Sequence, residues 1–411
     1  MRVVIIGTGP AGITAAEALR TADRTVDISV LSTEPYPPYS PPALADHFLT
    51  GRAATLFWKG RDVCQRLSIE ERREASVVAV EPDAHQISLA DGTRLPYDRL
   101  LLASGGRLYA PIPGNELAGV HNFKSLRAAD ALIGQVCRGE ARSAIIVGGG
   151  FIGVEIALLL ADLGVAVMVV ELRERVMPGM LDQETAEIAR GVLEARGVRV
   201  RLRTEATAFE GDEQAQGVRL ASGELLTADI YIAATGVKPT VDYLAGSGIA
   251  TEWGVRVDDR LRTNAPDVFA AGDVAETADR MTGRRYVHAI FPNAVEQGRV
   301  AAINLLGGSA TYEGAESMNS LKHLGVPVMA VGAAEGEEEL RWRRGDVLRK
   351  VFLTDGRIVG FRLAGDISAG GVYRALMLRR DDVHRYGRRL VDPGFGVGRL
   401  VWTAIAPGGQ P

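Results

Sequence analysis

Two stretches of this chain share one pattern of hydrophobic and polar positions. Each has a short apolar run, then a helical stretch of small and apolar residues, then a second strand-like run. The first stretch spans residues 2–31, and the second spans residues 144–170. Short apolar runs of this kind are typical of buried parallel strands. The pattern therefore predicts two βαβ units and an α/β fold.

A glycine-rich G-x-G-x-x-G turn follows the first strand of each unit. The glycines permit a tight turn and let the backbone approach a pyrophosphate, while the helix N-terminus supplies N–H donors. Two such turns in one chain predict two bound dinucleotides. The predicted binding residues are Gly7, Gly9, Pro10, Ala11 and Gly12 in the first turn and Gly148, Gly150, Phe151, Ile152 and Gly153 in the second.

Residues at the ends of the second strands are candidates for binding ribose. Glu171 ends the later strand, where a carboxylate can accept hydrogen bonds from both ribose hydroxyls and repel a 2′-phosphate. This favours NAD(H) over NADP(H), although Arg173 and Arg175 follow and can admit a 2′-phosphate. In the first unit the acid comes later than is usual. Ser32 and Glu34 can each serve the ribose there, and we predict Glu34.

Composition and charge narrow the class of protein. A chain of 411 residues with 46% hydrophobic and 24% charged residues is ordinary for a globular protein of two or three domains. The net charge of -4 gives no basic excess for binding nucleic acid. Because Asp162 and Gly164 interrupt the longest apolar stretch, we expect no membrane span, and we expect no signal peptide.

Cysteines and histidines are few and scattered. The two cysteines, Cys64 and Cys137, have no metal-ligand or C-x-x-C spacing, and the six histidines occur singly. We expect structural roles for both cysteines and no protein-bound metal. The predicted compartment is the cytoplasm, where thiols stay reduced.

Three further motifs complete an ordered set with the two glycine turns. They are Leu101-Leu102-Ala103-Ser104-Gly105, Ala233-Ala234-Thr235-Gly236-Val237-Lys238-Pro239 and Asp267-Val268-Phe269-Ala270-Ala271-Gly272-Asp273. The chain thereby resembles the pyridine nucleotide–disulfide oxidoreductase superfamily over nearly its whole length. The likeness is strongest to the FAD-containing branch without redox cysteines, which comprises ferredoxin-reductase-, rubredoxin-reductase- and nitrite-reductase-like proteins. The resemblance implies FAD at the first turn and NAD(H) at the second.

The resemblance also assigns residues around FAD. Ser104, Gly105 and Gly236 match the family's A-T-G turns at the crossings between its FAD and NAD domains. Asp273, after Gly272, matches the aspartate that holds the ribityl and phosphate region of FAD.

A second group of residues is implied near the reacting rings. Glu155 matches the family's acid beside the nicotinamide. The segment Pro292–Arg299 resembles the helix start under the flavin, which places Glu296 and Gln297 near the isoalloxazine.

The implied architecture is an NAD domain inserted into an FAD domain, followed by an α+β interface domain. The expected ranges are 1–112 and 238–311 for FAD, 113–237 for NAD(H) and 312–411 for the interface domain. Within the last, the pattern predicts strands at 327–332, 347–353 and 358–363, a helix at 372–379, and a solvated hairpin turn at 335–339.

The residues that would decide the chemistry depart from both main branches of the family. Pro42 stands where related disulfide reductases, NADH oxidases and peroxidases carry their early redox cysteine. Pro41 and Asp46 stand where ferredoxin reductases carry an arginine and a lysine. These differences bear on the electron acceptor and leave the two cofactors unchanged.

The predicted reaction is hydride transfer between NAD(H) and FAD, followed by single-electron transfer between FAD and an iron–sulfur protein or subunit. The flavin can exchange electrons in pairs or singly, so the protein has only to align the two rings. Residues 317–325 and the basic segment 379–389 resemble FAD/NAD subunits of multi-subunit anaerobic oxidoreductases of aldehydes or 2-oxoacids. In such complexes electrons would flow from substrate to NAD.

Two alternatives remain open at this point. One is a stand-alone NADH oxidase or peroxidase, which Pro42 disfavours because the sulfur is missing. The other is a non-catalytic flavoprotein whose bound FAD and NADH regulate assembly or signalling.

Overall fold

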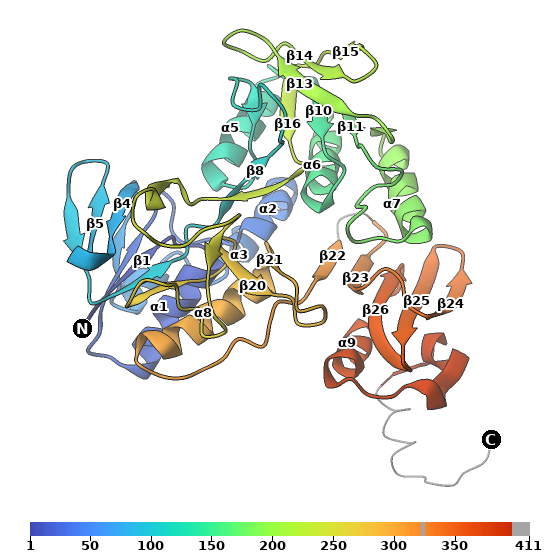
Figure 1. Cartoon of the computed structure of the whole chain (residues 1–411). Helices are drawn as coiled ribbons and strands as arrows, with labels where there is room; N and C mark the ends of the chain where they lie inside the picture. The colour runs from blue at the N-terminus through green and yellow to red at the C-terminus, as the bar shows by residue number, and fades with distance from the viewer. Residues whose placement is uncertain (322–324, 397–411) are drawn as a thin grey trace. The chain divides into compact units, whose positions relative to one another are not determined.

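The computed structural model describes residues 1–321 and 325–396 and divides into two compact units (Figure 1). The first unit comprises Met1–Arg142, Phe209–Gln216 and Asp229–Glu316. The second comprises Ser143–Ala208, Gly217–Ala228 and Ser317 to the C-terminus. The three-domain boundaries expected from the sequence stay a prediction.

A five-stranded parallel sheet forms the centre of the first unit. Its order is β19 (Val268–Ala270), β7 (Arg99–Leu102), β1 (Arg2–Ile6), β2 (Asp27–Leu31) and β3 (Glu70–Arg72). The neighbouring pairs are all parallel, which confirms the first predicted βαβ unit with α1 (Pro10–Ala22) as its helix.

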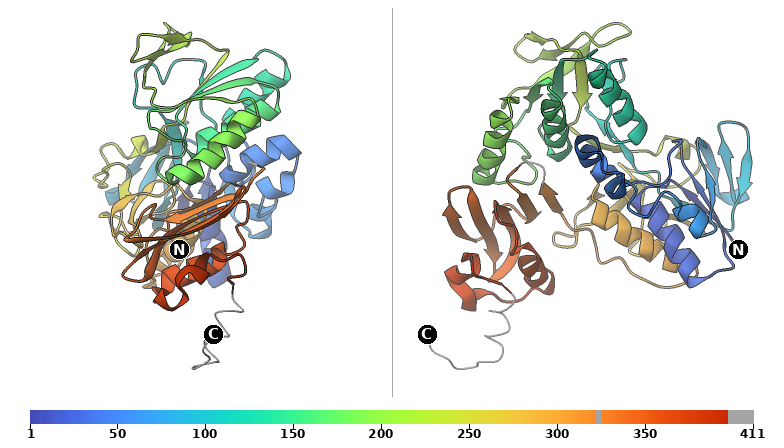
Figure 2. Two further views of the ribbon diagram at one scale, coloured as in Figure 1. Left: turned by 90° about the vertical axis from the view of Figure 1, so that its right-hand side faces the viewer. Right: turned by 180° about the vertical axis from the view of Figure 1, so that it is seen from behind.

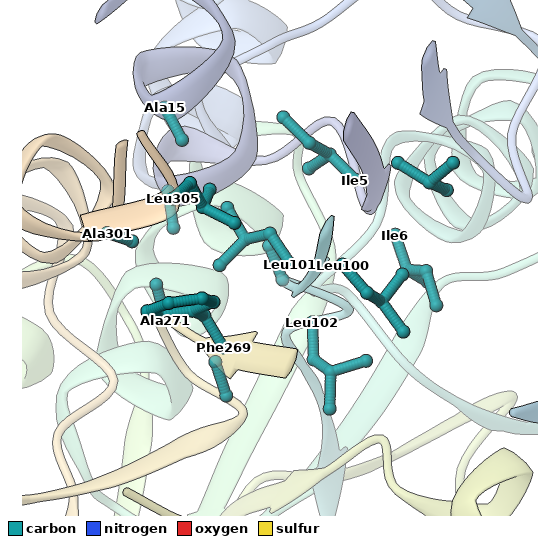
Figure 3. Packing of buried hydrophobic residues seen from close by; sticks show 14 of the residues in the cluster. Ile5, Ile6, Ala15, Leu100, Leu101, Leu102, Phe269, Ala271, Ala301 and Leu305 are labelled. Atoms are coloured by element: carbon teal, nitrogen blue, oxygen red, sulfur yellow. The ribbon is translucent and has the colours of Figure 1, made fainter. Parts of the chain in front are cut away.

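The core of this unit is built from the apolar runs that predicted its strands. Ile5, Leu101 and Phe269 lie at paired positions of β1, β7 and β19 and are at most 6% exposed. Figure 3 shows Ala15 of α1 and Leu305 of α8 (Phe291–Leu305) against these strands. The two helices pack against each other, so α8 belongs to the same layer as α1.

Smaller elements complete the first unit. The helices are α2 (Leu44–Thr50), α3 (Ala53–Leu56), α4 (Val63–Arg66) and α5 (Leu126–Cys137). Two small sheets are formed by β4 (Val77–Glu81), β5 (Gln86–Leu89) and β6 (Arg94–Pro96), which are antiparallel, and by β18 (Val255–Arg256), β20 (Ala275–Ala278) and β21 (Arg285–Val287). Two strand pairs are the antiparallel β8 (Gly106–Tyr109) with β17 (Gly236–Pro239) and the parallel β9 (Val120–His121) with β16 (Ile230–Ala233).

The second unit contains the second predicted βαβ motif. Strands β10 (Ser143–Val147), β11 (Ala166–Val170) and β12 (Arg199–Arg201) pair in parallel. Helix α6 (Phe151–Asp162) joins β10 to β11, and α7 (Gln183–Ala195) precedes β12. Strands β13 (Ala206–Glu210), β14 (Gly217–Leu220) and β15 (Leu225–Leu226) form a small sheet.

The C-terminal part of this unit is an antiparallel sheet with one helix. Its order is β22 (Met318–Leu321), β23 (Val328–Gly332), β26 (Arg357–Ala364), β25 (Val347–Thr354) and β24 (Glu338–Arg344), followed by α9 (Gly370–Arg379) and a 3-10 segment, His384–Val391. Figure 2 shows this orange-to-red block with α7, in light green, beside it.

The predicted strands and helix of this region are confirmed within one or two residues at each end. The predicted hairpin turn at 335–339 is wrong in its last two residues, because β24 already begins at Glu338. Cross-strand pairing with β25 extends to this point and draws the end of the acidic run into the ladder. Lys322–Leu324 of the 317–325 motif lies outside the described residues.

Candidate functional site

The first glycine turn is fixed by contacts that only glycine permits. Gly7 has φ +113°, and a Cβ there would lie 2.1 Å from the Ala103 carbonyl oxygen. A Cβ at Gly12 would lie 2.0 Å from the Gly7 carbonyl oxygen. These approaches bring the start of α1 against the end of β7. At Gly9, by contrast, no described atom lies within 4 Å of the Cβ position.

The N-terminus of α1 is suited to an anion. Gly9 is the N-cap, Pro10 begins the helix, and no described side chain caps this end. The first turn carries no acidic residue. The first N–H groups of a helix lack intrahelical acceptors and carry partial positive charge. The open space at Gly9 and these donors fit a pyrophosphate.

The Gly272–Asp273 segment is held close to this turn. Gly272 has φ +80°, and its Cβ would lie 3.0 Å from that of Ala11. The buried Gln297 side chain accepts a hydrogen bond from the Gly272 N–H at 2.7 Å. At Gly298 a Cβ would lie 2.4 Å from the Ala11 carbonyl oxygen. Helix α8 therefore positions Asp273 by packing its backbone directly on α1.

Asp273 forms an ion pair that sequence reasoning missed. Lys124 Nζ donates to Asp273 Oδ2 at 2.6 Å, and the two side chains are 15% and 17% exposed. Lys124 lies between β9 and α5 and belongs to no recognisable motif. Its position next to Asp273 makes it a further candidate for the FAD phosphate region.

Glu34 lies at the start of a loop that it ties to α5. Its Oε2 accepts from the Tyr39 hydroxyl at 2.5 Å, and its Oε1 accepts from the Arg127 N–H at 2.9 Å. The Tyr39 hydroxyl oxygen in turn accepts from the Leu126 N–H at 2.9 Å. The Ser32 hydroxyl accepts from the Glu34 N–H at 3.1 Å. Both oxygens of the Glu34 carboxylate thus already accept a hydrogen bond from within the protein.

The two A-T-G-like turns flank the β8–β17 pair. The Ser104 hydroxyl donates to the Thr240 carbonyl at 2.9 Å, and Thr235 donates to the Tyr109 carbonyl at 2.8 Å. Gly105 has φ +67°. No described atom lies within 4 Å of the Cβ position of either Gly105 or Gly236. The Ser104 and Thr235 hydroxyls therefore hold the two turns in place, while Gly105 and Gly236 face open space.

The second glycine turn brings Glu171 to its backbone. Gly148 has φ +110°, and the Gly149 N–H donates to Glu171 Oε2 at 2.7 Å. The Arg173 N–H donates to Glu171 Oε1 at 2.8 Å. Glu171 is 7% exposed, and a Cβ at Gly149 would lie 3.2 Å from it. Although about twenty residues separate the glycine turn from Glu171 in the sequence, the two are in direct contact in the structure.

Helix α6 begins as α1 does. Gly150 is its N-cap, no described side chain caps this end, and no described atom lies within 4 Å of the Gly150 Cβ position. Phe151 and Ile152 are half-buried in the first turn, with Gly153 buried behind them. One turn later, burial raises the pKa of Glu155 to about 8, so its carboxyl is mostly protonated at neutral pH.

The loop after Glu171 folds on itself. The Arg175 guanidinium donates to the Leu181 carbonyl at 2.9 Å, whereas the Arg173 side chain is exposed. The Met177 N–H donates to the Gly149 carbonyl at 2.7 Å. One of the two arginines next to the candidate ribose acid is therefore engaged within its own loop.

The remaining candidates lie on helices α8, α2, α4 and α5. Gln297 is buried and tied to Gly272, whereas Glu296 on the same helix is half-buried. Asp46 accepts from the Thr55 hydroxyl at 2.9 Å. Burial raises the pKa of Cys64 to about 12, so its thiol stays protonated, while Cys137 is exposed.

Neither a cluster of metal ligands nor a membrane-spanning helix occurs in the part of the chain that the structure describes. Within it, no group of three or more His, Cys, Asp or Glu side chains is arranged to hold a metal ion. Its helices include none that is long and apolar enough to cross a membrane.

Residues 1–298 match the family model described as pyridine nucleotide-disulphide oxidoreductase. The chain is 32% identical to the epsilon subunit of NADH-dependent phenylglyoxylate dehydrogenase of Aromatoleum evansii, over 98% of this chain and 97% of that one. It is 34% identical to the ferredoxin reductase component of a chlorobenzene dioxygenase from Cupriavidus sp. strain PS12, over 87% of each chain. In fold it is similar to a chain of the covalent putidaredoxin reductase–putidaredoxin complex, with a TM-score of 0.86, 23% identity, and coverage of 98% of this chain and 99% of that one.

Proposed function

This chain belongs to the pyridine nucleotide-disulphide oxidoreductase family, and from that premise we propose that it transfers hydride between NAD(H) and FAD and single electrons between FAD and an iron–sulfur protein or subunit. The observation that carries the proposal is the pair of complete glycine turns in a chain that has Pro42 at the family's cysteine position. Without that thiol the second electron-transfer step has no protein sulfur to use. A separate one-electron carrier then best fits the chemistry.

The first glycine turn and the Gly272–Asp273 segment are the proposed FAD site. The α1 N-terminus would bind the pyrophosphate in the open space at Gly9. Lys124 would offset the charge of Asp273 beside the phosphates. When bound, FAD supplies the ability to accept electrons as a pair and release them singly.

Glu34 remains the proposed ribose residue of this site. Each of its carboxylate oxygens has two lone pairs, and one on each oxygen already accepts from Tyr39 or the Arg127 N–H. The lone pairs that remain would accept the ribose hydroxyls. Ser104, Gly105 and Gly236 are proposed to line the same cofactor where the chain turns.

The second glycine turn is the proposed NAD(H) site, with preference over NADP(H). The buried Glu171 carboxylate is oriented by two backbone N–H donors and would accept the ribose hydroxyls. Its negative charge would repel a 2′-phosphate. Arg175 is engaged with its own loop, which leaves the exposed Arg173 as the cation that could meet such a phosphate.

Glu155, Glu296 and Gln297 are the proposed neighbours of the reacting rings. A protonated Glu155 places no charge beside a nicotinamide, whereas an ionised one would. Gln297 would act by fixing Gly272 rather than by reacting.

The relatives support the proposed partner. One relative is a ferredoxin reductase component and another is a subunit of a dehydrogenase, which supports an iron–sulfur partner or a larger assembly. We propose FAD-binding, NAD-binding and interface domains at 1–112 with 238–311, 113–237 and 312–411, and a cytoplasmic location.

The test compares electron acceptors in steady state. The purified holoprotein is supplied with NADH and, in parallel, with a [2Fe–2S] ferredoxin, with air-saturated buffer, or with hydrogen peroxide. We expect efficient ferredoxin reduction and slow consumption of oxygen and peroxide. Turnover with oxygen or peroxide that exceeds turnover with ferredoxin would contradict the proposal and favour a stand-alone oxidase or peroxidase.

A further inference from the structure

A buried lysine joins the C-terminal sheet to helix α7. Lys350 of β25 is 6% exposed, yet its ammonium group contacts three carboxylates. Its Nζ lies 2.6 Å from Asp182 Oδ2, 3.1 Å from Glu184 Oε2 and 3.1 Å from Glu339 Oε1. Asp182 is the N-cap of α7, and Glu184 lies in its first turn. Both Figure 1 and Figure 2 show α7 beside this sheet.

Two arginines of β24 extend the cluster. Arg341 donates to Glu184 at 2.5 and 2.8 Å, and Arg343 donates to it at 2.8 Å. The Arg341 hydrogen bonds are the largest of the effects that hold the pKa of Glu184 far below its usual range. The Glu184 carboxyl is therefore ionised at neutral pH.

A buried ion pair is weak evidence of a net gain in stability, because desolvating the charges costs about as much as their attraction returns. Its better-attested effect is to fix one arrangement of the elements that carry it. The element fixed here is the start of α7, which is also the end of the loop that leaves Glu171.

That loop is continuous with the proposed ribose site. The Arg173 N–H orients Glu171, and the Met177 N–H donates to the carbonyl of Gly149, whose own N–H donates to Glu171. The Leu181 N–H donates to the Met177 carbonyl at 3.0 Å. Asp182, the next residue, then reaches Lys350. Every step from the ribose carboxylate to the C-terminal sheet is thus a direct contact.

We propose that Lys350 is a positioning residue for the nicotinamide dinucleotide: by holding Asp182, it fixes the loop that orients Glu171 at the glycine turn. The inference rests on the proposed NAD(H) site. Loss of the ammonium group would remove the ion pair of Asp182, whereas Glu184 would keep Arg341 and Arg343, so the loop end would lose its tie to the sheet.

The test is a binding measurement that requires no turnover. ADP-ribose is the dinucleotide without its nicotinamide ring, so calorimetric titration of the holoprotein with it reports binding of the adenosine, pyrophosphate and ribose parts without any contribution from the ring. We expect Lys350→Met to weaken ADP-ribose about tenfold, the effect of roughly 1.4 kcal/mol of lost coupling, and Lys350→Arg to stay within about twofold of the wild type. FAD content should be unchanged in both variants.

A matched control is Arg190→Met on the same helix. Arg190 pairs with Glu187 and Glu194 on the exposed face, and neither belongs to the cluster. It should bind ADP-ribose as the wild type does. Asp182→Asn is the second test variant, because it preserves the shape of the side chain. It should weaken the affinity for ADP-ribose as Lys350→Met does, and it replaces Lys350→Met in the test if that variant does not fold.

The outcomes separate the inference from its premise. Folded Lys350→Met or Asp182→Asn protein that binds ADP-ribose like the wild type would overturn the positioning role while leaving the NAD(H) site intact. A melting temperature lowered without a change in affinity would overturn it as well, because it would assign Lys350 to stability alone. Failure of the wild type itself to bind would overturn the proposed site and the inference with it.

Discussion

Replacement of Glu171 by glutamine tests the coenzyme site with little disturbance of the fold. Glutamine has the same shape and keeps one acceptor oxygen, but it removes the negative charge. In the protein both carboxylate oxygens accept backbone N–H groups, from Gly149 at 2.7 Å and from Arg173 at 2.8 Å. The Glu171→Gln amide nitrogen would face one of these donors, so the side chain would also lose one hydrogen bond.

The expected size of the effect follows from these contacts. Two unit charges about 5 Å apart repel by about 3.3 kcal/mol at an effective dielectric constant of about 20, and solvent screening leaves roughly half of that. Replacing the charge-assisted hydrogen bond to a ribose hydroxyl by a neutral one weakens the binding free energy of NADH by about 1.4 kcal/mol. Together these terms favour NADPH by about 3 kcal/mol, which is on the order of a 100-fold fall in the NADH-to-NADPH preference.

The assay is the ratio of kcat/KM for NADH and NADPH, measured without oxygen and with a dye acceptor in excess. Binding of ADP-ribose and of its 2′-phosphate checks that the change lies in affinity. A ratio that moves by less than about threefold in folded, FAD-loaded protein would refute the assigned role of Glu171.

Three further substitutions test other parts of the structure. Gly298→Ala places a methyl group 2.4 Å from the α1 backbone, so it should lower the free energy of unfolding by about 1–3 kcal/mol and lower the FAD content. The control is Gly191→Ala on α7, where no described atom lies within 4 Å of the new methyl group, and it should raise the melting temperature slightly. Lys124→Met removes the ion pair of Asp273 and should weaken the affinity for FAD about tenfold. The affinity is measured by titrating apoprotein with FAD and following the flavin fluorescence, and an unchanged affinity would show that Lys124 is not part of the site. For Glu155, burial raises the folded pKa to about 8 from its ordinary value of 4.5, so its contribution to stability is complete below pH 4.5 and is lost as pH rises through 8. Glu155→Gln should therefore flatten the fall in urea-unfolding free energy between pH 5 and pH 9, and parallel pH profiles for the two proteins would contradict the raised pKa.

The sequence predicted well what local patterns encode. The glycine turns, their strands and the Glu171 contact follow from spacing rules, because a turn, a buried strand and a helix start each require particular residues within a few positions. Strands β23, β25 and β26 of the C-terminal sheet were equally predictable from their apolar runs, whereas β22 and β24 were not predicted.

What could not be predicted depends on contacts between distant segments. Lys124 and Asp273 are 149 positions apart, and Lys350 and Asp182 are 168 positions apart, so no spacing rule relates them. The engagement of Glu34 with Tyr39 and α5 is of the same kind, since it depends on where α5 begins in space. The sequence around each of these residues resembles an ordinary polar surface segment.

The proposed function requires hydride to pass between NADH and bound FAD. This transfer can be followed by mixing the FAD-loaded protein with NADH in an oxygen-free stopped-flow instrument and recording the flavin absorbance. We expect fast bleaching that saturates with NADH, and rapid recovery of the absorbance when a one-electron iron–sulfur acceptor is added. Bleaching that is absent or takes minutes, with a reduced flavin that persists after the acceptor is added, would contradict the proposed function and favour a regulatory flavoprotein.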